Sequence, residues 1–251
     1  MGREIPILMS GPLVRATLEG AKPEYARSYP AKTQTRRPIR CASNIEHMGK
    51  LLGEWGLSVP PHQYDGDGDL WRWHGKQPPQ KGDWVEKVQS DVDDSYMAPV
   101  KGLAAAGDVL WVRETWDWRD WQSGADGKIR IAYAADGAQV VRVAPPDWNP
   151  TIYNAEHWRP SIHMPRWACR LVLPLVKVRI ERVQAISEED AWAEGYGEHW
   201  RRRVKEAGAD GPLGRPDARG WFAMLWDKLY GTWGKNPWVA VYEWGAIEVS
   251  R

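Results

Sequence analysis

The chain has 251 residues and carries 34 Lys and Arg against 33 Asp and Glu, so its formal net charge is +1. With 43% hydrophobic and 27% charged residues, the composition excludes an intrinsically disordered chain and allows a sizeable core. Because the net charge is near zero, any affinity for nucleic acid must come from a local basic patch. This length allows one large domain or two modest ones, and we expect a single domain over residues 1–251.

The aromatic and cysteine content gives further information about the core, the absence of a zinc site and the cellular compartment. There are 18 Trp and 9 Tyr but one Phe, so most indoles are expected in the core and a minority against a ligand. Cys41 and Cys169 have neither metal-ligand nor redox spacing, which predicts no zinc site and a reducing compartment. A secretory signal pattern and a bilayer-spanning apolar run are both absent from the sequence, so we expect a cytoplasmic protein with no membrane partner.

The first 40 residues predict a strand, a helix and a basic segment. Residues 5–10 are an apolar run typical of a strand, and a helix is expected next, with Ser10 as its N-cap and Gly20 as its end. Residues 32–40 then bring four positive charges and two hydroxyl groups together without an acidic residue. Such a segment favours an anion, with phosphate first, and we interpret it as a basic loop. A solvated surface loop is the alternative.

Residues 41–105 read as an insertion of loops and short strands, because they contain two proline pairs and the turn-rich run at 65–69. Three aspartates in that run alternate like the start of a calcium loop. However, Lys76 occupies the position where a closing glutamate would stand, so a polar turn is favoured over calcium binding.

The rest of the chain is rich in predicted strands, at residues 109–116, 129–134, 140–143, 169–183 and 238–244. The second and third form a hairpin, and Pro174 implies an edge position or a bulge in the fourth. One helix is expected from Ser187, as N-cap, to Gly195, and another over residues 221–230. Between them, residues 196–219 form a second, charged insertion, in which Arg201, Arg202 and Arg203 are either a nucleic-acid track or a solvated face.

Five segments carry a family resemblance: residues 7–16, 32–37, 107–116, 158–167 and 186–195. In this order they resemble the phage and prophage branch of the ASCH-domain family. The resemblance implies an α+β fold, namely a PUA-like mixed β-barrel flanked by short helices, with insertions at about 41–105 and 196–219. It also implies a cleft for RNA or a modified nucleobase.

Some members of this family remove an acyl group from the exocyclic amine of a cytidine derivative, using a G-x-K-x-x-T-x-R motif and a glutamate from a short helix. Lys32, Thr35 and Arg37 stand at the motif spacing, and Glu194 stands where the helix glutamate would be. The resemblance therefore implies that Lys32, Thr35 and Glu194 are catalytic. The motif glycine is replaced by Pro30, which is a departure from the family pattern.

The chemistry of these three residues is consistent with that role. A partly buried lysine next to two arginines has its neutral form favoured and can act as a base, while Thr35 is the nucleophile or orients water. Glu194, near a helix C-terminus, would shuttle the proton. Lys22 competes with Lys32 for the role of the motif lysine, but Tyr25 then replaces the threonine. Alternatively, Lys32 and Thr35 hold a phosphate, and Glu194 pairs with Arg36 or Arg37.

Nucleic-acid contacts are expected from basic and aromatic residues of the basic segment and of the matching segments: Arg36, Arg37, Arg40, Arg113, Trp116, Arg159, His163 and Arg166. His163 has no spaced metal-binding partner, and Ser161 with His163 lacks the geometry of a nucleophilic pair, so we expect neither metal nor cofactor. Glu114 lines the cleft or pairs with an arginine.

Three functions remain open. The first is a nucleic-acid-binding protein of phage origin, which takes RNA, DNA or a modified nucleoside in a bacterial host cell. The second is a metal-independent hydrolase that acts on an acylated cytidine or cuts RNA. The third is a phage-encoded factor that binds a host protein through the insertions.

Overall fold

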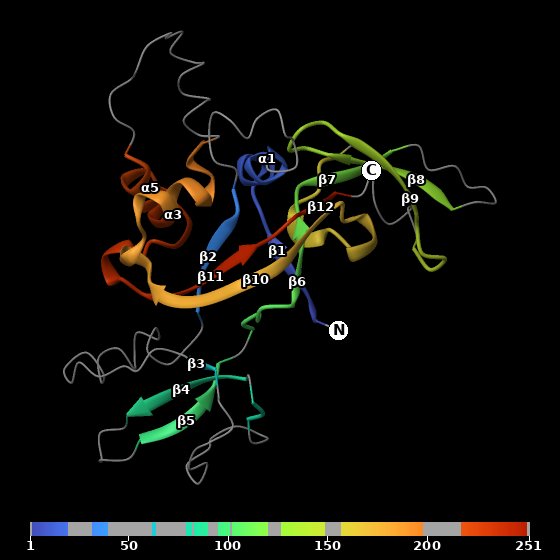
Figure 1. Cartoon of the computed structure of the whole chain (residues 1–251). Helices are drawn as coiled ribbons and strands as arrows, with labels where there is room; N and C mark the ends of the chain where they lie inside the picture. Colours follow the sequence, from blue (N-terminus) through green and yellow to red (C-terminus); the bar gives the residue numbers. More distant parts are fainter. Residues whose placement is uncertain are drawn as a thin grey trace.

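The computed structural model describes residues 2–19, 32–39, 62–63, 79–81, 83–89, 95–100, 102–119, 127–148, 157–197 and 217–249. Within these residues the chain has an α+β fold with three sheets and few helices (Figure 1). None of the described helices is long and apolar enough to cross a membrane.

The largest sheet has the strand order β1-β6-β10-β11-β2, and the short β12 also pairs with β10. Its strands are β1 (Glu4–Leu8), β2 (Gln34–Pro38), β6 (Val109–Arg113), β10 (Leu171–Arg182), β11 (Trp238–Trp244) and β12 (Glu248–Val249). The β1–β6 pair is parallel and the other pairs are antiparallel. Among the described residues the edge strands β1 and β2 are not paired with each other, so this sheet is not a closed barrel.

Two three-stranded sheets are not hydrogen-bonded to the large sheet; in Figure 1 the β3–β5 sheet lies apart from it, and the β7–β9 sheet follows directly after β6. One comprises β3 (His62–Gln63), β4 (Trp84–Gln89) and β5 (Ser95–Pro99), which are the short strands expected in the first insertion. The other comprises β7 (Trp116–Arg119), β8 (Lys128–Tyr133) and β9 (Gln139–Val143), and it contains the predicted hairpin. Its inner face has a core of its own, in which several indoles pack edge to face.

The described α-helices are α1 (Gly11–Glu19), α3 (Glu188–Ala191) and α5 (Ala218–Tyr230), and the described residues also form short 3₁₀ turns at 161–163, 166–168, 183–185 and 233–235. Ser10 directly precedes α1 and Ser187 caps α3, as predicted, whereas the predicted helix end at Gly20 lies outside the described residues. The Ser187 hydroxyl accepts from Asp190 N at 3.0 Å, and Gly231 ends α5 with a left-handed φ of 63°. In contrast, the helix expected to run to Gly195 has only four α-helical residues, and a π-helical turn (Trp192–Tyr196) continues it.

Two strand predictions also need correction. The predicted strand 109–116 is divided between β6 and β7, because Glu114 and Thr115 turn the chain from one sheet to the other. Pro174 lies in β10, which is internal to the sheet, so the edge position is wrong. A register shift between Leu175 and Lys177 confirms the bulge close to it.

The basic segment is not a loop. Residues 34–38 form β2, which pairs with β11, and three of its five residues are buried. A strand of this composition can be buried because acidic side chains from β10, α3 and the π turn lie against its basic ones. Predictions for Lys22, Pro30, Arg40, Cys41, the run at 65–69 and Arg201–Arg203 fall outside the described residues.

Candidate functional site

Lys32 and Glu194, which are 162 residues apart in the sequence, meet in the interior of the protein. The Lys32 ammonium donates to Glu194 Oε2 at 3.0 Å, to the Glu194 carbonyl at 2.8 Å and to the Gln34 carbonyl at 2.7 Å. Lys32 is 1% exposed and Glu194 is 4% exposed. The three N–H groups of the ammonium therefore each have an acceptor, and the carboxylate is held in one orientation.

Arg36 extends this contact into a buried ion-pair cluster. Its guanidinium donates to Glu194 Oε1 at 3.1 Å, to Glu181 Oε1 at 2.6 and 2.9 Å, and to Asp190 Oδ2 at 2.6 Å. Arg179, which like Glu181 belongs to β10, pairs with Glu181 and Asp190. Arg36 was expected to hold phosphate. Instead, three carboxylates of the chain neutralise it, and its side chain is fully buried.

The π turn places Glu194 against β2. Its next residue, Gly195, has a φ of 106°, which side chains of L-residues rarely allow. A Cβ at Gly195 would lie 3.2 Å from Ala16 Cβ and 3.5 Å from Lys32 Cδ. Backbone hydrogen bonds from the Thr33 N–H to the Ala193 carbonyl (3.0 Å) and from the Lys32 N–H to the Ala16 carbonyl (3.1 Å) connect α1, the residues just before β2 and the π turn. Position 195 therefore needs glycine for both its backbone conformation and the close approach of α1.

Burial lowers the pKa of Lys32 from 10.5 to about 8, although the Glu194 carboxylate opposes this change. The direction agrees with the sequence-based expectation, but the main cause is desolvation, and the neighbouring arginines are minor contributors. A lysine with this pKa releases its proton at mildly alkaline pH, which an exposed lysine does not do.

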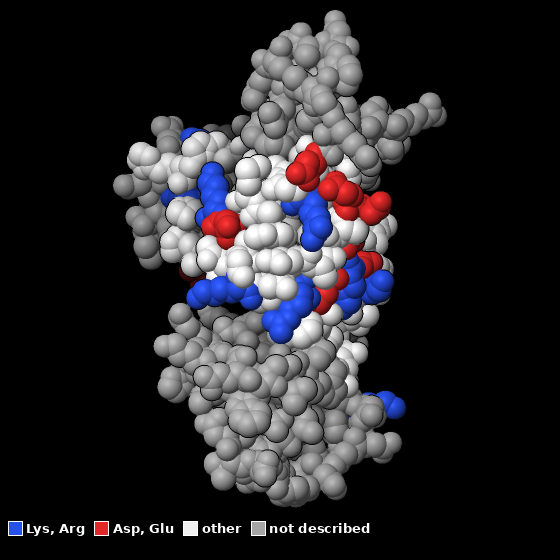
Figure 2. Space-filling view, turned by 90° about the vertical axis from the view of Figure 1, so that its left-hand side faces the viewer, with Lys and Arg blue, Asp and Glu red and all other residues white. Residues whose placement is uncertain are grey.

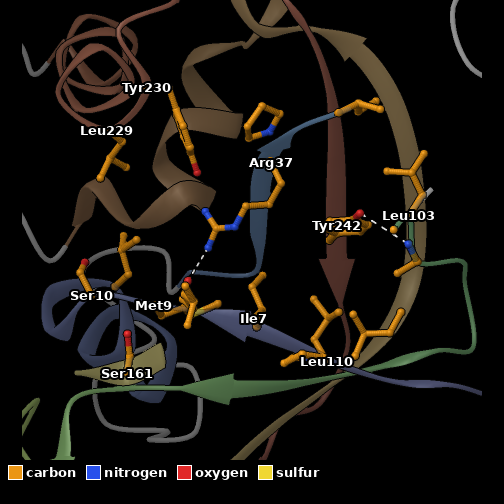
Figure 3. A pocket seen from close by; sticks show the side chains of 18 of the residues that line it. Ile7, Met9, Ser10, Arg37, Leu103, Leu110, Ser161, Leu229, Tyr230 and Tyr242 are labelled. Atoms are coloured by element: carbon orange, nitrogen blue, oxygen red, sulfur yellow. Dashed lines mark hydrogen bonds between the residues drawn. The ribbon is translucent and has the colours of Figure 1, made fainter. Parts of the chain in front are cut away.

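A cavity of about 810 Å³ lies between the edge strands β1 and β2, as Figure 3 shows. Its floor includes Leu110 of β6 and Tyr242 of β11, and an N–H donated by Arg37 to the Leu8 carbonyl (2.7 Å) links the two edges. The described lining is mainly apolar, and Arg37 is the one charged residue in it. This volume and this lining are typical of sites for small organic ligands.

A second, much smaller cavity of about 20 Å³ adjoins the ion-pair cluster, and Thr35, Arg36 and Glu194 line it. Four residues line both cavities: Leu13, Arg37, Leu229 and Tyr230. The small cavity has room for about one water molecule. Thr35 and Glu194 thus line the same small cavity next to the large one, whereas Lys32 lies behind Glu194 and is not among the described lining residues of either cavity.

The other residues expected to bind nucleic acid lie elsewhere, and the described linings include none of them: Arg113, Trp116, Arg159, His163 and Arg166. Arg159 is paired with the buried Asp117, and Arg166 with Glu4 at 2.7 Å. Arg113 donates to the Ile162 carbonyl, Trp116 is a core residue, and His163 is exposed. The structure does not bring these residues together with Lys32.

Glu114 is an ion-pair partner. Its carboxylate accepts two bonds of 2.8 Å from Arg170, which also pairs with Asp136 at 2.9 Å. Burial raises the pKa of Glu114, and Arg170 opposes this change. The arginine directly precedes β10 and joins it to the β6–β7 corner and to the β8–β9 turn, so this cluster has a structural role.

On the face shown in Figure 2, the described residues form no continuous basic track. Several Lys and Arg side chains there lie next to Asp or Glu, and the middle of the face is largely uncharged. Among the described residues, no group of three or more His, Cys, Asp or Glu is placed to hold a metal ion.

Sequence reasoning missed Glu181 and Asp190, the acidic partners of Arg36, and it missed Tyr230 and Tyr242 of the cavity wall. The one indication in the sequence was that the acidic residues at the start of the predicted helix and at the end of the predicted strand had no assigned partner, while the basic segment contained no acidic residue. Comparisons of the chain with protein-family models, with curated proteins and with solved structures found no match. The fold and site define an α+β protein with a ligand-sized cavity next to a buried lysine–glutamate pair.

Proposed function

We propose that the chain is a PUA-like protein of the ASCH type, which binds a modified nucleobase in the large cavity and hydrolyses an amide on it. The observation that carries this proposal is the Lys32–Glu194 contact of 3.0 Å next to a cavity of about 810 Å³. Such a volume suits one nucleoside and excludes a duplex. The arginines expected to hold a nucleic-acid backbone are largely paired within the protein, which favours a small ligand over a polymer.

The two cavities suggest where the ligand binds and where the reaction takes place. The body of the ligand fills the large cavity, and its amide carbonyl lies at the boundary with the small one. Water in the small cavity, or the Thr35 hydroxyl, adds to the carbonyl carbon. Glu194 and neutral Lys32 take up the proton and return it to the leaving amine. The products of the complete reaction with water are a carboxylic acid and a free amine, and the proposed reaction needs no metal.

Hydrolysis of N4-acetylcytidine, followed in the presence of a chelator, tests the proposal. Loss of a positioned acid–base group should lower kcat about 100-fold or more in Glu194→Gln and Lys32→Met. Glu243→Gln makes the same chemical change at a carboxylate that pairs with Lys177 and Arg179 and is not among the described lining residues. It should retain activity. A wild-type protein with no turnover, or equal rates for Glu194→Gln and Glu243→Gln, would rule out the proposed reaction.

Binding without turnover is the second candidate. Every donor of the Lys32 ammonium is already satisfied within the protein, as in a purely structural ion pair. In addition, Trp158 is 49% exposed and the Arg119 guanidinium lies 5.8 Å from its ring centroid, an arrangement that can stack a base. Salt-sensitive binding of labelled single-stranded RNA or DNA, lost in Trp158→Ala and unaccompanied by hydrolysis, would support this candidate.

A further inference from the structure

Arg37 enters the large cavity with most of its hydrogen-bonding capacity unused (Figure 3). Its guanidinium donates to the Leu8 carbonyl at 2.7 Å and to the Arg36 carbonyl at 3.4 Å. A guanidinium has five N–H groups, so three remain without a partner among the described residues. Among the described residues no carboxylate pairs with Arg37, whereas three carboxylates pair with Arg36.

This makes Arg37 different from most other arginines of the structure. Those with a carboxylate partner include Arg3, Arg36, Arg119, Arg159, Arg166, Arg170 and Arg179. Two further arginines, Arg113 and Arg182, lie 5.5 and 4.1 Å from the ring centroids of Trp111 and Trp238. Neither is among the described residues that line the large cavity.

The surroundings of Arg37 favour an anion. The described lining of the large cavity contains no Asp or Glu, so an anion there meets no like charge in that part of the wall. The polar groups that it does contain are mainly hydroxyls, including those of Tyr230 and Tyr242. Apolar walls lower the local dielectric, which strengthens a bond between a guanidinium and an oxyanion and makes an unpaired cation costly.

We infer that the ligand of the large cavity carries an oxyanion, a carboxylate or a phosphate, and that the planar fork of Arg37 binds it. This inference rests on the proposed function for the nucleobase part of the ligand. What it adds is that the ligand also carries a negative charge. Within that function, the substrate is an acylated nucleotide or a nucleoside whose acyl group ends in a carboxylate, and Arg37 determines this specificity.

Calorimetric binding with two matched pairs tests the inference without requiring turnover. The first pair is N4-acetylcytidine and its 5′-monophosphate, and the second is N4-acetylcytidine and N4-succinylcytidine. We expect the anionic member of one pair to bind about 10- to 100-fold more tightly than the neutral compound, as for a charge-assisted hydrogen bond. The pair that shows the preference distinguishes phosphate from carboxylate.

Variants at Arg37 then assign the preference to this side chain. Arg37→Gln keeps a donor for the Leu8 carbonyl but has no charge, and it should bring the affinity ratio close to one. Arg130→Met also removes an arginine, on the exposed face of β8 outside the described linings, and should keep the ratio. Equal affinities within both pairs, absence of binding by every member, or a ratio that survives in Arg37→Gln would each overturn the inference. Failure of hydrolysis alone would overturn only the proposed function.

Discussion

The stability of the protein should depend on pH through Lys32. Burial lowers the pKa of this group from 10.5 to about 8 in the folded chain, whereas the unfolded chain retains the ordinary value. Between these two pH values the unfolded chain holds a proton that the folded chain has released. Unfolding free energy therefore rises with pH across this window and receives no pH-dependent contribution from Lys32 below it.

The size of the effect follows from the change in pKa. One pKa unit corresponds to about 1.4 kcal/mol, so the change at Lys32 amounts to on the order of 3 kcal/mol. Lys32→Met removes the titrating group but keeps an unbranched side chain of similar length. The free energy of unfolding of wild type minus that of Lys32→Met should rise by this amount from pH 8 to pH 10.5. Urea unfolding followed by the fluorescence of the 18 Trp measures both proteins at each pH.

Lys177→Met is the matched control, because the Lys177 side chain is 61% exposed and its nearest carboxylate oxygen is 3.7 Å away. Tyrosine and cysteine titrations are common to all three proteins and largely cancel in the differences. The control should show no comparable rise. A flat difference for Lys32→Met as well would mean that Lys32 keeps its ordinary pKa, and the proposed base would then be protonated at the pH of the reaction.

Two further predictions concern the surroundings of the site. Gly195→Ala should lower the free energy of unfolding by about 2 kcal/mol or more, because of the φ of 106° at this position and the contact of the added Cβ with Ala16. Gly137→Ala, at φ 75° with open space around it, should lose only the part of the free energy of unfolding that comes from the backbone conformation. Equal losses of the two variants in urea unfolding would contradict this. Arg170→Met should cost about 3 to 5 kcal/mol, because it leaves Glu114 buried without its bidentate cation. The double variant Arg170→Met/Glu114→Leu should recover part of that loss in the same assay, and a single-variant cost below about 1 kcal/mol would refute the structural role.

Local patterns were sufficient for much of the secondary structure. The β8–β9 hairpin, the strand Trp238–Trp244 and the end of α5 at Gly231 follow from turn residues, apolar runs and a left-handed cap, which act over a few residues. The basic segment was interpreted wrongly because charged residues are normally exposed. Its acidic partners lie 145 to 162 residues further along the chain, so no local pattern could show that β2 would be buried.

The site was predictable only in part. The contact between Lys32 and Glu194 was expected from the family resemblance, because the residues alone supplied a spacing and no distance. The large cavity was not predicted, since its walls come from β1, β2, β6, β11 and the segment around Leu103, and tertiary folding alone brings these together. Arg36 and Arg37 are adjacent in sequence, but successive residues of a strand face opposite sides of the sheet. The Arg36 side chain therefore lies against acidic side chains, whereas the Arg37 side chain lines the large cavity.

The costs within the ion-pair cluster bear on whether it is only structural. A lysine whose pKa is lowered by burial destabilises the folded chain at neutral pH, and an apolar residue of the same volume would avoid that cost. Gly195 adds a backbone conformation that most residues cannot adopt, directly after the carboxylate that Lys32 holds. Neither cost is needed to join β2 to α3, because Arg36 with Glu181 and Asp190 already does so. Among the described residues, Glu194 is the one carboxylate that both belongs to the cluster and lines the small cavity. The desolvation of Lys32 and the backbone constraint at Gly195 both act next to Glu194, and the function proposed above for Glu194 would account for both costs.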